Sequence, residues 1–82
     1  GEHFTLMEQL KAKAEFTTAT RIATIDGLRV EYADGFGLAR PSNTTPVIVL
    51  RFEADTPAAL ARIQDDFRAQ FARVNPEIVL PF

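Results

Sequence analysis

The chain has no cysteine, no tryptophan, and no apolar run longer than four residues among its 82. Without cysteine it cannot build a disulfide scaffold, a thiol nucleophile or a zinc site with Cys ligands. An apolar run of four is far too short to span a membrane, so no membrane partner is expected. These absences fit a protein of the reducing cytoplasm, which is the location that we expect.

An excess of basic charge is also missing. Nine Lys and Arg side chains stand against eleven Asp and Glu, which gives a formal net charge of −2. Non-specific binding of nucleic acid needs a dense positive field that displaces counterions, so we expect no nucleic-acid partner. The hydrophobic share of 46% and the charged share of 24% are ordinary for one soluble globular domain.

Two segments have the 3.6-residue periodicity of amphipathic helices. The first runs from Glu2 to about Phe16. The second begins at Thr56 and Pro57, a capping residue followed by proline at the first helical position, and it ends before Pro76. The aromatic residues expected in the core are Phe4, Phe67 and Phe71. The polar residues expected to face solvent, or to be only lightly packed, are His3, Asp65 and Asp66.

β-Branched residues, alternation and turn signals predict four strands between the helices. The predicted strands are Thr17–Ile25, Leu28–Tyr32, Phe36–Ala39 and Pro46–Ala54. Asp26-Gly27 predicts a tight turn with positive φ at both residues, and Asp34-Gly35 indicates a second turn. Because short turns join antiparallel neighbours, we predict an α+β fold, a four-stranded antiparallel sheet with two helices packed on one face.

The segment between the last two predicted strands, Arg40-Pro41-Ser42-Asn43-Thr44-Thr45-Pro46, is rich in hydrogen-bond donors. It holds a guanidinium, three hydroxyls and a carboxamide, and no acidic residue lies between Gly35 and Arg51. A guanidinium can donate two parallel N–H···O bonds to a phosphate. Asn43 tolerates the left-handed conformation that lets backbone N–H groups converge on an anion. The segment therefore favours a phosphate-like ligand; the alternative is a turn whose polar side chains hydrogen-bond only to its own backbone.

This segment and its surroundings resemble a known protein family. With Asp34-Gly35-Phe36-Gly37-Leu38 before it and Val-Ile-Val-Leu-Arg-Phe-Glu-Ala after it, the segment resembles the C-terminal domain of the α-D-phosphohexomutases. Within that superfamily it is most similar to the bacterial phosphomannomutase/phosphoglucomutases. The resemblance runs from about Ile25 to Phe82, and the first helix adds nothing to it.

The resemblance implies a TBP-like fold that binds the phosphate group of a sugar. The family's phosphate contacts map onto Arg40, Ser42, Asn43 and Thr44, and Thr45 and Arg51 are expected to add to them. The family often has Gly at the Asn43 position and Glu at the second threonine, so these contacts are expected to use mainly backbone N–H groups. One more strand usually precedes the first helix in the family, and we expect that strand to lie outside this chain.

The resemblance also implies that other domains of a larger enzyme carry the catalytic motifs. In the family a phosphoserine, an Asp-rich Mg²⁺ loop and a sugar-recognition loop belong to three other domains, and no such motif occurs here. We therefore expect residues 1–82 to be a single phosphate-binding C-terminal domain, excised from a phosphohexomutase. That enzyme would interconvert the 1-phosphate and 6-phosphate of glucose or mannose through a bisphosphorylated hexose. The domain alone would bind a phosphosugar without catalysis, and would hold no metal or cofactor.

The sequence also allows a different class of function. The chain could be a small α+β protein-interaction or ligand-sensing module with no enzymatic role. Its sheet face or sheet edge would then bind a partner.

Overall fold

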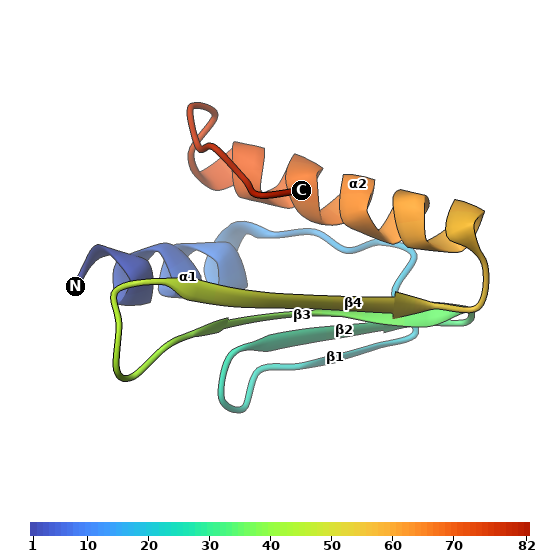
Figure 1. Cartoon of the computed structure of the whole chain (residues 1–82), viewed down its shortest axis with the longest axis horizontal. Helices are drawn as coiled ribbons and strands as arrows, with labels where there is room; N and C mark the ends of the chain where they lie inside the picture. The colour runs from blue at the N-terminus through green and yellow to red at the C-terminus, as the bar shows by residue number, and fades with distance from the viewer.

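The computed structural model describes every residue from Gly1 to Phe82. Its elements are α1 (Glu2–Lys13), β1 (Arg21–Ala23), β2 (Leu28–Tyr32), β3 (Gly35–Pro41), β4 (Ile48–Ala54) and α2 (Pro57–Val74). The strands form one antiparallel sheet in the order β1-β2-β3-β4, and both helices lie on the same face of it (Figure 1). The predicted α+β fold is confirmed.

The first strand is the main departure from the predicted elements. β1 is only three residues long, and the chain ahead of it turns at residues 17–18 instead of extending. The reason is Phe16, whose side chain is buried in the core and whose carbonyl accepts a hydrogen bond from Ala19 N–H. Anchoring Phe16 bends the chain before it reaches the sheet. For the same reason α1 ends at Lys13, three residues earlier than predicted.

The two predicted turns differ in how they use glycine. Asp26 and Gly27 have φ angles of 60° and 129°, so the first turn is confirmed with positive φ at both residues. The second turn is centred on Ala33 and Asp34, because Tyr32 pairs with Gly35 across the β2–β3 hairpin. Gly35 instead begins β3, where a Cβ atom would lie 2.3 Å from a backbone carbonyl oxygen of β4. That glycine is needed for close approach and not for its φ angle.

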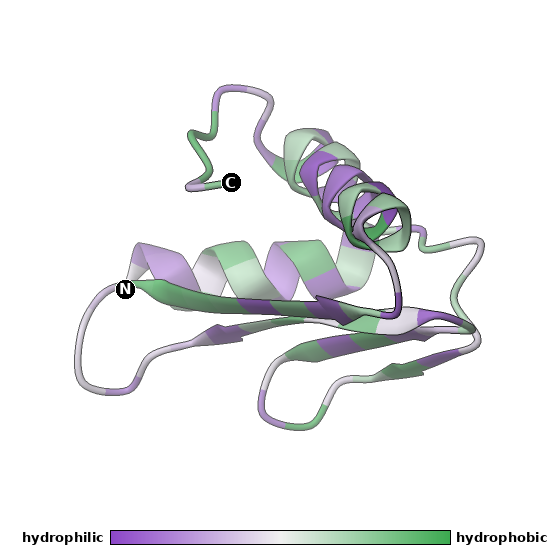
Figure 2. Ribbon diagram, turned by 45° about the vertical axis from the view of Figure 1, so that its right-hand side comes forward, coloured by the Kyte–Doolittle hydropathy of each residue, from purple (hydrophilic) through white to green (hydrophobic).

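The core lies between the sheet and the helices and follows the alternation of the strands. Along β2, hydrophobic and hydrophilic residues alternate (Figure 2), and Leu28, Val30 and Tyr32 are the buried ones. The buried residues that form the core cluster are Met7, Leu10, Phe16, Leu28, Val30, Tyr32, Ala39, Ile63, Phe67 and Phe71. The opposite face of the sheet carries no helix.

The helix predictions for the core were right for α2 and wrong for one residue of α1. Phe67 and Phe71 are fully buried, but Phe4 is 41% exposed. The first turn of α1 lies at the end of the sheet (Figure 1), so the Phe4 ring packs on the His3 ring, 4.1 Å between centroids. Met7 and Leu10 are the residues through which α1 reaches the core.

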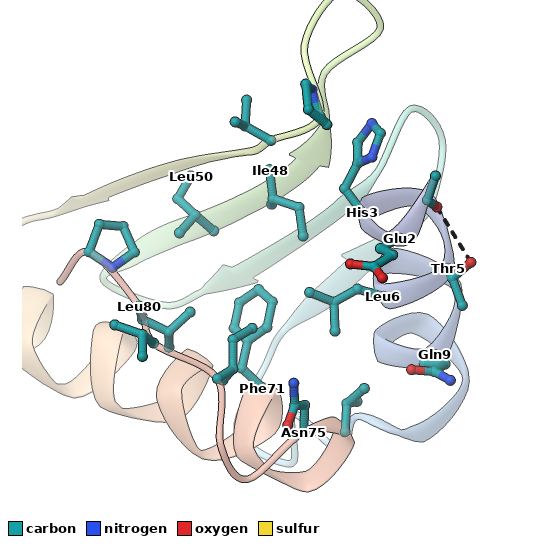
Figure 3. Close-up of a pocket in the computed structure, with 17 residues that line it drawn as sticks. Glu2, His3, Thr5, Leu6, Gln9, Ile48, Leu50, Phe71, Asn75 and Leu80 are labelled. Carbon is teal, nitrogen blue, oxygen red and sulfur yellow. Dashed lines mark hydrogen bonds between the residues drawn. The ribbon is translucent and has the colours of Figure 1, made fainter.

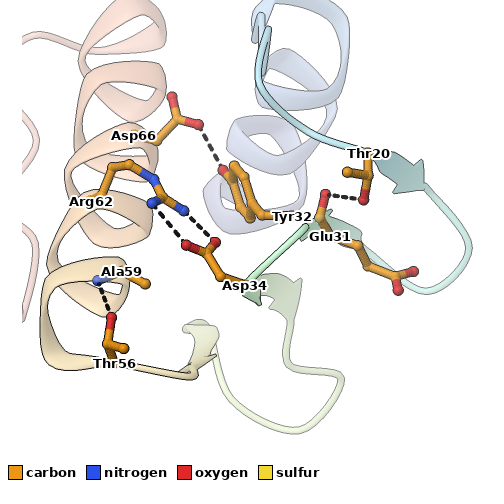
Figure 4. Close-up of polar contacts among 8 residues, drawn as sticks. All are labelled: Thr20, Glu31, Tyr32, Asp34, Thr56, Ala59, Arg62 and Asp66. Atoms are coloured by element: carbon orange, nitrogen blue, oxygen red, sulfur yellow. Dashed lines mark hydrogen bonds and ion pairs between the residues drawn. The ribbon is translucent and has the colours of Figure 1, made fainter.

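A polar cluster joins the β2–β3 hairpin to α2, and we call it the β2–β3 clamp (Figure 4). Asp34 accepts two hydrogen bonds from Arg62, one of them 2.9 Å from Nη1 to Oδ2, and the Tyr32 hydroxyl donates to Asp66 Oδ2 at 2.7 Å. The Arg62 hydrogen bonds lower the pKa of Asp34, while burial and the Asp66 carboxylate raise the pKa of Tyr32. The expectation that Asp66 faces solvent was wrong, because its carboxylate is turned toward the sheet to accept this bond.

Candidate anion-binding site

The predicted site lies at the opposite end of β3 from the clamp, where residues 42–47 join β3 to β4 (Figure 1). Arg40 and Pro41 belong to β3, paired with Val49 and Ile48, so the loop is shorter than the sequence indicated. The Ser42 N–H donates to the Val47 carbonyl at 2.9 Å and closes the loop. The sheet thus fixes both ends of the loop and places Arg40 directly beside it.

Ser42 organises this loop through its side chain. Its Oγ accepts hydrogen bonds from the backbone N–H groups of Thr44 and Thr45, both at 3.3 Å, and from Thr45 Oγ1 at 3.2 Å. Thr44 Oγ1 lies 3.3 Å from the same atom. Four polar groups therefore surround one oxygen atom. The interpretation of the loop as a turn that satisfies its own backbone is thus correct for Ser42.

The tip of the loop remains available to an external partner. Asn43, Thr44 and Thr45 are exposed, and the Asn43 carboxamide makes no hydrogen bond within the chain. Asn43 does not adopt the left-handed conformation that it tolerates, since Asp26 is the only non-glycine residue with positive φ. The loop N–H groups converge without it because they share Ser42 Oγ as their acceptor.

Arg40 differs from every other arginine in the chain. The arginines that form ion pairs with Asp or Glu are Arg21, Arg29, Arg51, Arg62, Arg68 and Arg73. Arg40 is exposed and has no acidic partner. By the alternation of β3 its Cβ lies on the sheet face opposite the helices, together with Phe36 and Leu38. A charged fork of donors beside the loop is therefore available to an anion.

Arg51 lies on the same face of the sheet but is already engaged. It pairs with Leu38 across β3 and β4, two positions from the Arg40–Val49 pair. Its guanidinium forms an ion pair with Glu53 at 2.8 Å. Arg51 therefore adds positive charge near the loop, largely offset by its own partner.

Two hollows flank the loop. A groove of about 380 Å³ is lined by Arg40, Pro41 and Asn43, together with the Asp26-Gly27 turn and α1 residues that include Lys11 and Glu8, an ion pair at 3.3 Å. A larger hollow of about 1170 Å³ lies between α1, β4 and the C-terminal segment (Figure 3). Its lining includes the apolar Leu6, Ile48, Leu50, Phe71 and Leu80 and neither Arg40 nor Asn43. We therefore place the candidate site at the smaller groove and the tip of the loop.

Sequence reasoning missed the contribution of His3 to this site. Its Nε2 atom lies 3.1 Å from the Ser42 carbonyl oxygen, so the first turn of α1 is bonded to the loop. The two residues are 39 positions apart and share no local pattern. His3 is half-buried and does not simply face solvent, and no sequence signal indicated what it contacts.

The acidic and histidine side chains do not assemble elsewhere into a metal site. No group of three or more His, Asp or Glu residues lies close enough together to hold a metal ion. None of the helices combines the length and the apolar character that crossing a membrane requires.

Comparison with known proteins gives the chain its relatives. The family model described as the C-terminal domain of phosphoglucomutase/phosphomannomutase matches residues 2–70. A phosphoglucomutase of Neisseria gonorrhoeae is 62% identical over 93% of this chain and 16% of its own length. A phosphomannomutase/phosphoglucomutase of Pseudomonas putida is 56% identical over 96% of this chain and 17% of its own.

A solved structure agrees with these matches. A crystal structure of a phosphoglucomutase/phosphomannomutase family protein from Burkholderia thailandensis superimposes with a TM-score of 0.94 at 61% identity, over 98% of this chain and 18% of that one. The chain thus spans less than a fifth of the length of the relatives that it matches. It belongs to the family of phosphoglucomutase/phosphomannomutase C-terminal domains.

Proposed function

We propose that residues 1–82 form the phosphate-binding C-terminal domain of a phosphohexomutase that interconverts the 1-phosphate and 6-phosphate of glucose or mannose. In this proposal Arg40, Ser42, Asn43 and Thr44 contact the phosphate group that is not reacting, with Thr45 in support. Binding energy from that remote group orients the reacting end of the sugar. Family membership weighs against the alternative of an interaction module with no enzymatic role.

The observation that carries the proposal is the single unpaired arginine beside a loop of converging donors. Six arginines form ion pairs with carboxylates, and the seventh, Arg40, lies in β3 two residues before Ser42, whose Oγ accepts from the N–H groups of Thr44 and Thr45. A phosphate oxygen accepts more strongly than a serine hydroxyl because it is charged. It would therefore compete with Ser42 Oγ for those N–H groups while Arg40 donates to a second oxygen.

The proposal assigns the reacting groups to the other three domains of the enzyme. The residues of this chain provide no cluster that fits a magnesium ion. In the proposal the Mg²⁺ that the family implies is held outside this chain, and the bisphosphorylated hexose meets this chain only through the phosphate that is not reacting. The chain alone should bind a sugar phosphate without converting it.

Titration of glucose 6-phosphate into the ¹⁵N-labelled chain tests the binding role. Each charge-assisted hydrogen bond contributes about 1.5–3 kcal/mol, and the costs of ordering leave an affinity of roughly millimolar or weaker. We expect amide shifts that cluster at residues 40–45. Glucose without a phosphate is the matched control and should leave these amides unchanged. Shifts spread evenly over the surface, or equal shifts with glucose, would contradict the proposal.

A further inference from the structure

We infer that His3 is a positioning residue for the loop: its Nε2–H···O=C hydrogen bond holds Ser42 where the loop donors converge. The effect on phosphate affinity rests on the proposed function, whereas the effect on loop conformation does not. His3 itself does not contact the phosphate. It acts only through Ser42.

The geometry makes Ser42 dependent on His3. Ser42 uses three polar groups at once: its N–H bonds to Val47, its Oγ accepts from Thr44 and Thr45, and its carbonyl accepts from His3 at 3.1 Å. The first two contacts lie within the loop and would move with it. The bond from His3 is the side-chain hydrogen bond that ties the Ser42 backbone to a different element, α1.

The surroundings of the imidazole fix how it can donate. A carbonyl oxygen only accepts, so Nε2 must carry the proton. Nδ1 is buried and has no hydrogen-bond partner, and it lies beside Gly1, against the adjoining Phe4 ring. Burying a second N–H without an acceptor would be costly, which also favours the tautomer with the proton on Nε2. Packing against Phe4 then holds the ring at the orientation that reaches Ser42.

The contacts of the first turn of α1 extend to both sides of the loop. Phe4 lines the smaller groove together with Asn43, while His3 lines the larger hollow together with Pro46 and Val47 (Figure 3). One helix turn of α1 thus supports a loop whose tip is exposed. Loss of the His3 bond should leave the sheet intact and let Ser42 and the two threonine N–H groups shift.

Two variants of similar size separate the hydrogen bond from packing. His3→Leu introduces an apolar side chain of comparable volume and removes the donor. His3→Gln restores an N–H donor at the same number of bonds from Cβ. Both are compared with the wild-type chain by ¹H–¹⁵N spectra before and after titration with glucose 6-phosphate, and thermal unfolding confirms that each is folded.

We expect the ¹H–¹⁵N spectrum of the wild-type His3 imidazole to show the proton on Nε2. His3→Leu should move the amide signals of Ser42, Thr44 and Thr45 and weaken phosphate affinity about three- to tenfold, the range for one neutral hydrogen bond. His3→Gln should recover most of both. If His3→Leu leaves loop signals and affinity unchanged, or if His3→Gln is no better than His3→Leu, His3 does not position the loop. If the wild-type chain does not bind the phosphate at all, the proposed function fails, and the loop signals alone decide on His3.

Discussion

At the Gly35 end of β3 the polar side chains are paired with one another across the sheet–helix interface, whereas at the Arg40 end the only arginine has no acidic partner within the chain. The clamp joins β2 and its turn to α2 through Asp34, Arg62, Tyr32 and Asp66. The loop at the other end is held by backbone and hydroxyl groups and by one imidazole. Strand β3 therefore has paired polar side chains at one end and hydrogen-bond donors that are open to a ligand at the other.

The difference shows what each end contributes. Ionic groups that find partners inside the domain fix the arrangement of its layers, and they offer little to a ligand. An unpaired exposed arginine adds nothing to folding, and its charge stays available. The comparison predicts that variants at the two ends will affect different properties.

The largest expected effect is on function, from Arg40→Ala in the intact enzyme. Under the proposed function the guanidinium donates charge-assisted hydrogen bonds to the phosphate, and their loss costs about 1.5–3 kcal/mol. We expect kcat/KM for the sugar phosphate to fall about 10- to 100-fold, while the unfolding temperature stays within error because Arg40 is exposed and unpaired. Steady-state kinetics test the expected fall in kcat/KM, and thermal unfolding of the same preparation tests the unchanged unfolding temperature.

The matched control is Arg21→Ala, which removes another exposed arginine from the sheet, ion-paired with Glu31. It should leave kcat/KM within about twofold of the wild type, since surface charges far from a site act weakly through screened solvent. Equal losses from both variants would mean that Arg40 acts through overall charge and not through contact.

At the clamp the expected effect is on stability, from Tyr32→Phe. The substitution keeps the buried ring and removes the hydroxyl that donates to Asp66 at 2.7 Å. A hydrogen bond to a charged group contributes about 1.5 kcal/mol or somewhat more, so the free energy of unfolding should fall by that amount. Urea unfolding measures it. Phosphate-induced shifts at residues 40–45 should be those of the wild type, and a change in them would show that the two ends are coupled.

Lowering the pH should weaken the β2–β3 clamp through its Asp34–Arg62 pair. The folded-state pKa of Asp34 is lowered by its hydrogen bonds from Arg62, relative to an ordinary value of 3.8. A lowered pKa means that the folded state binds the proton less tightly than the unfolded one. The clamp's contribution is therefore present above about pH 4 and is lost as pH falls through the lowered pKa. In Asp34→Asn this loss should be absent, so the free energies of unfolding of the two proteins, measured in urea, should converge as the pH falls below the lowered pKa. A constant difference at all pH values would contradict the assignment.

What the sequence predicts well here depends on neighbours along the chain. Helix caps, strand alternation and the Asp26-Gly27 turn are local, and each placed its element to within a few residues, apart from β1. The donor-rich composition of residues 40–46 predicts an anion site from the same kind of local pattern, and that site stays a prediction.

What the sequence could not show depends on residues brought together by folding. The bond between His3 and Ser42 crosses 39 positions, and the one between Tyr32 and Asp66 crosses 34. Phe4 matched the periodicity of its helix, yet it lies where the sheet has already ended. Helical periodicity says which residues share a face and not how far along the helix that face stays covered.

The smallest expected effect returns to the loop and asks which atoms do the binding. Thr45→Val removes the hydroxyl that donates to Ser42 Oγ at 3.2 Å and keeps the backbone N–H that points at the same oxygen. If binding uses mainly the backbone N–H groups, loss of one exposed hydroxyl should weaken glucose 6-phosphate by only about twofold, as measured by the same amide titration. A loss as large as that of Arg40→Ala would mean that the hydroxyl itself binds the phosphate. The loop would then resemble the β2–β3 clamp at the other end of β3, because side chains and not the backbone would make its contacts.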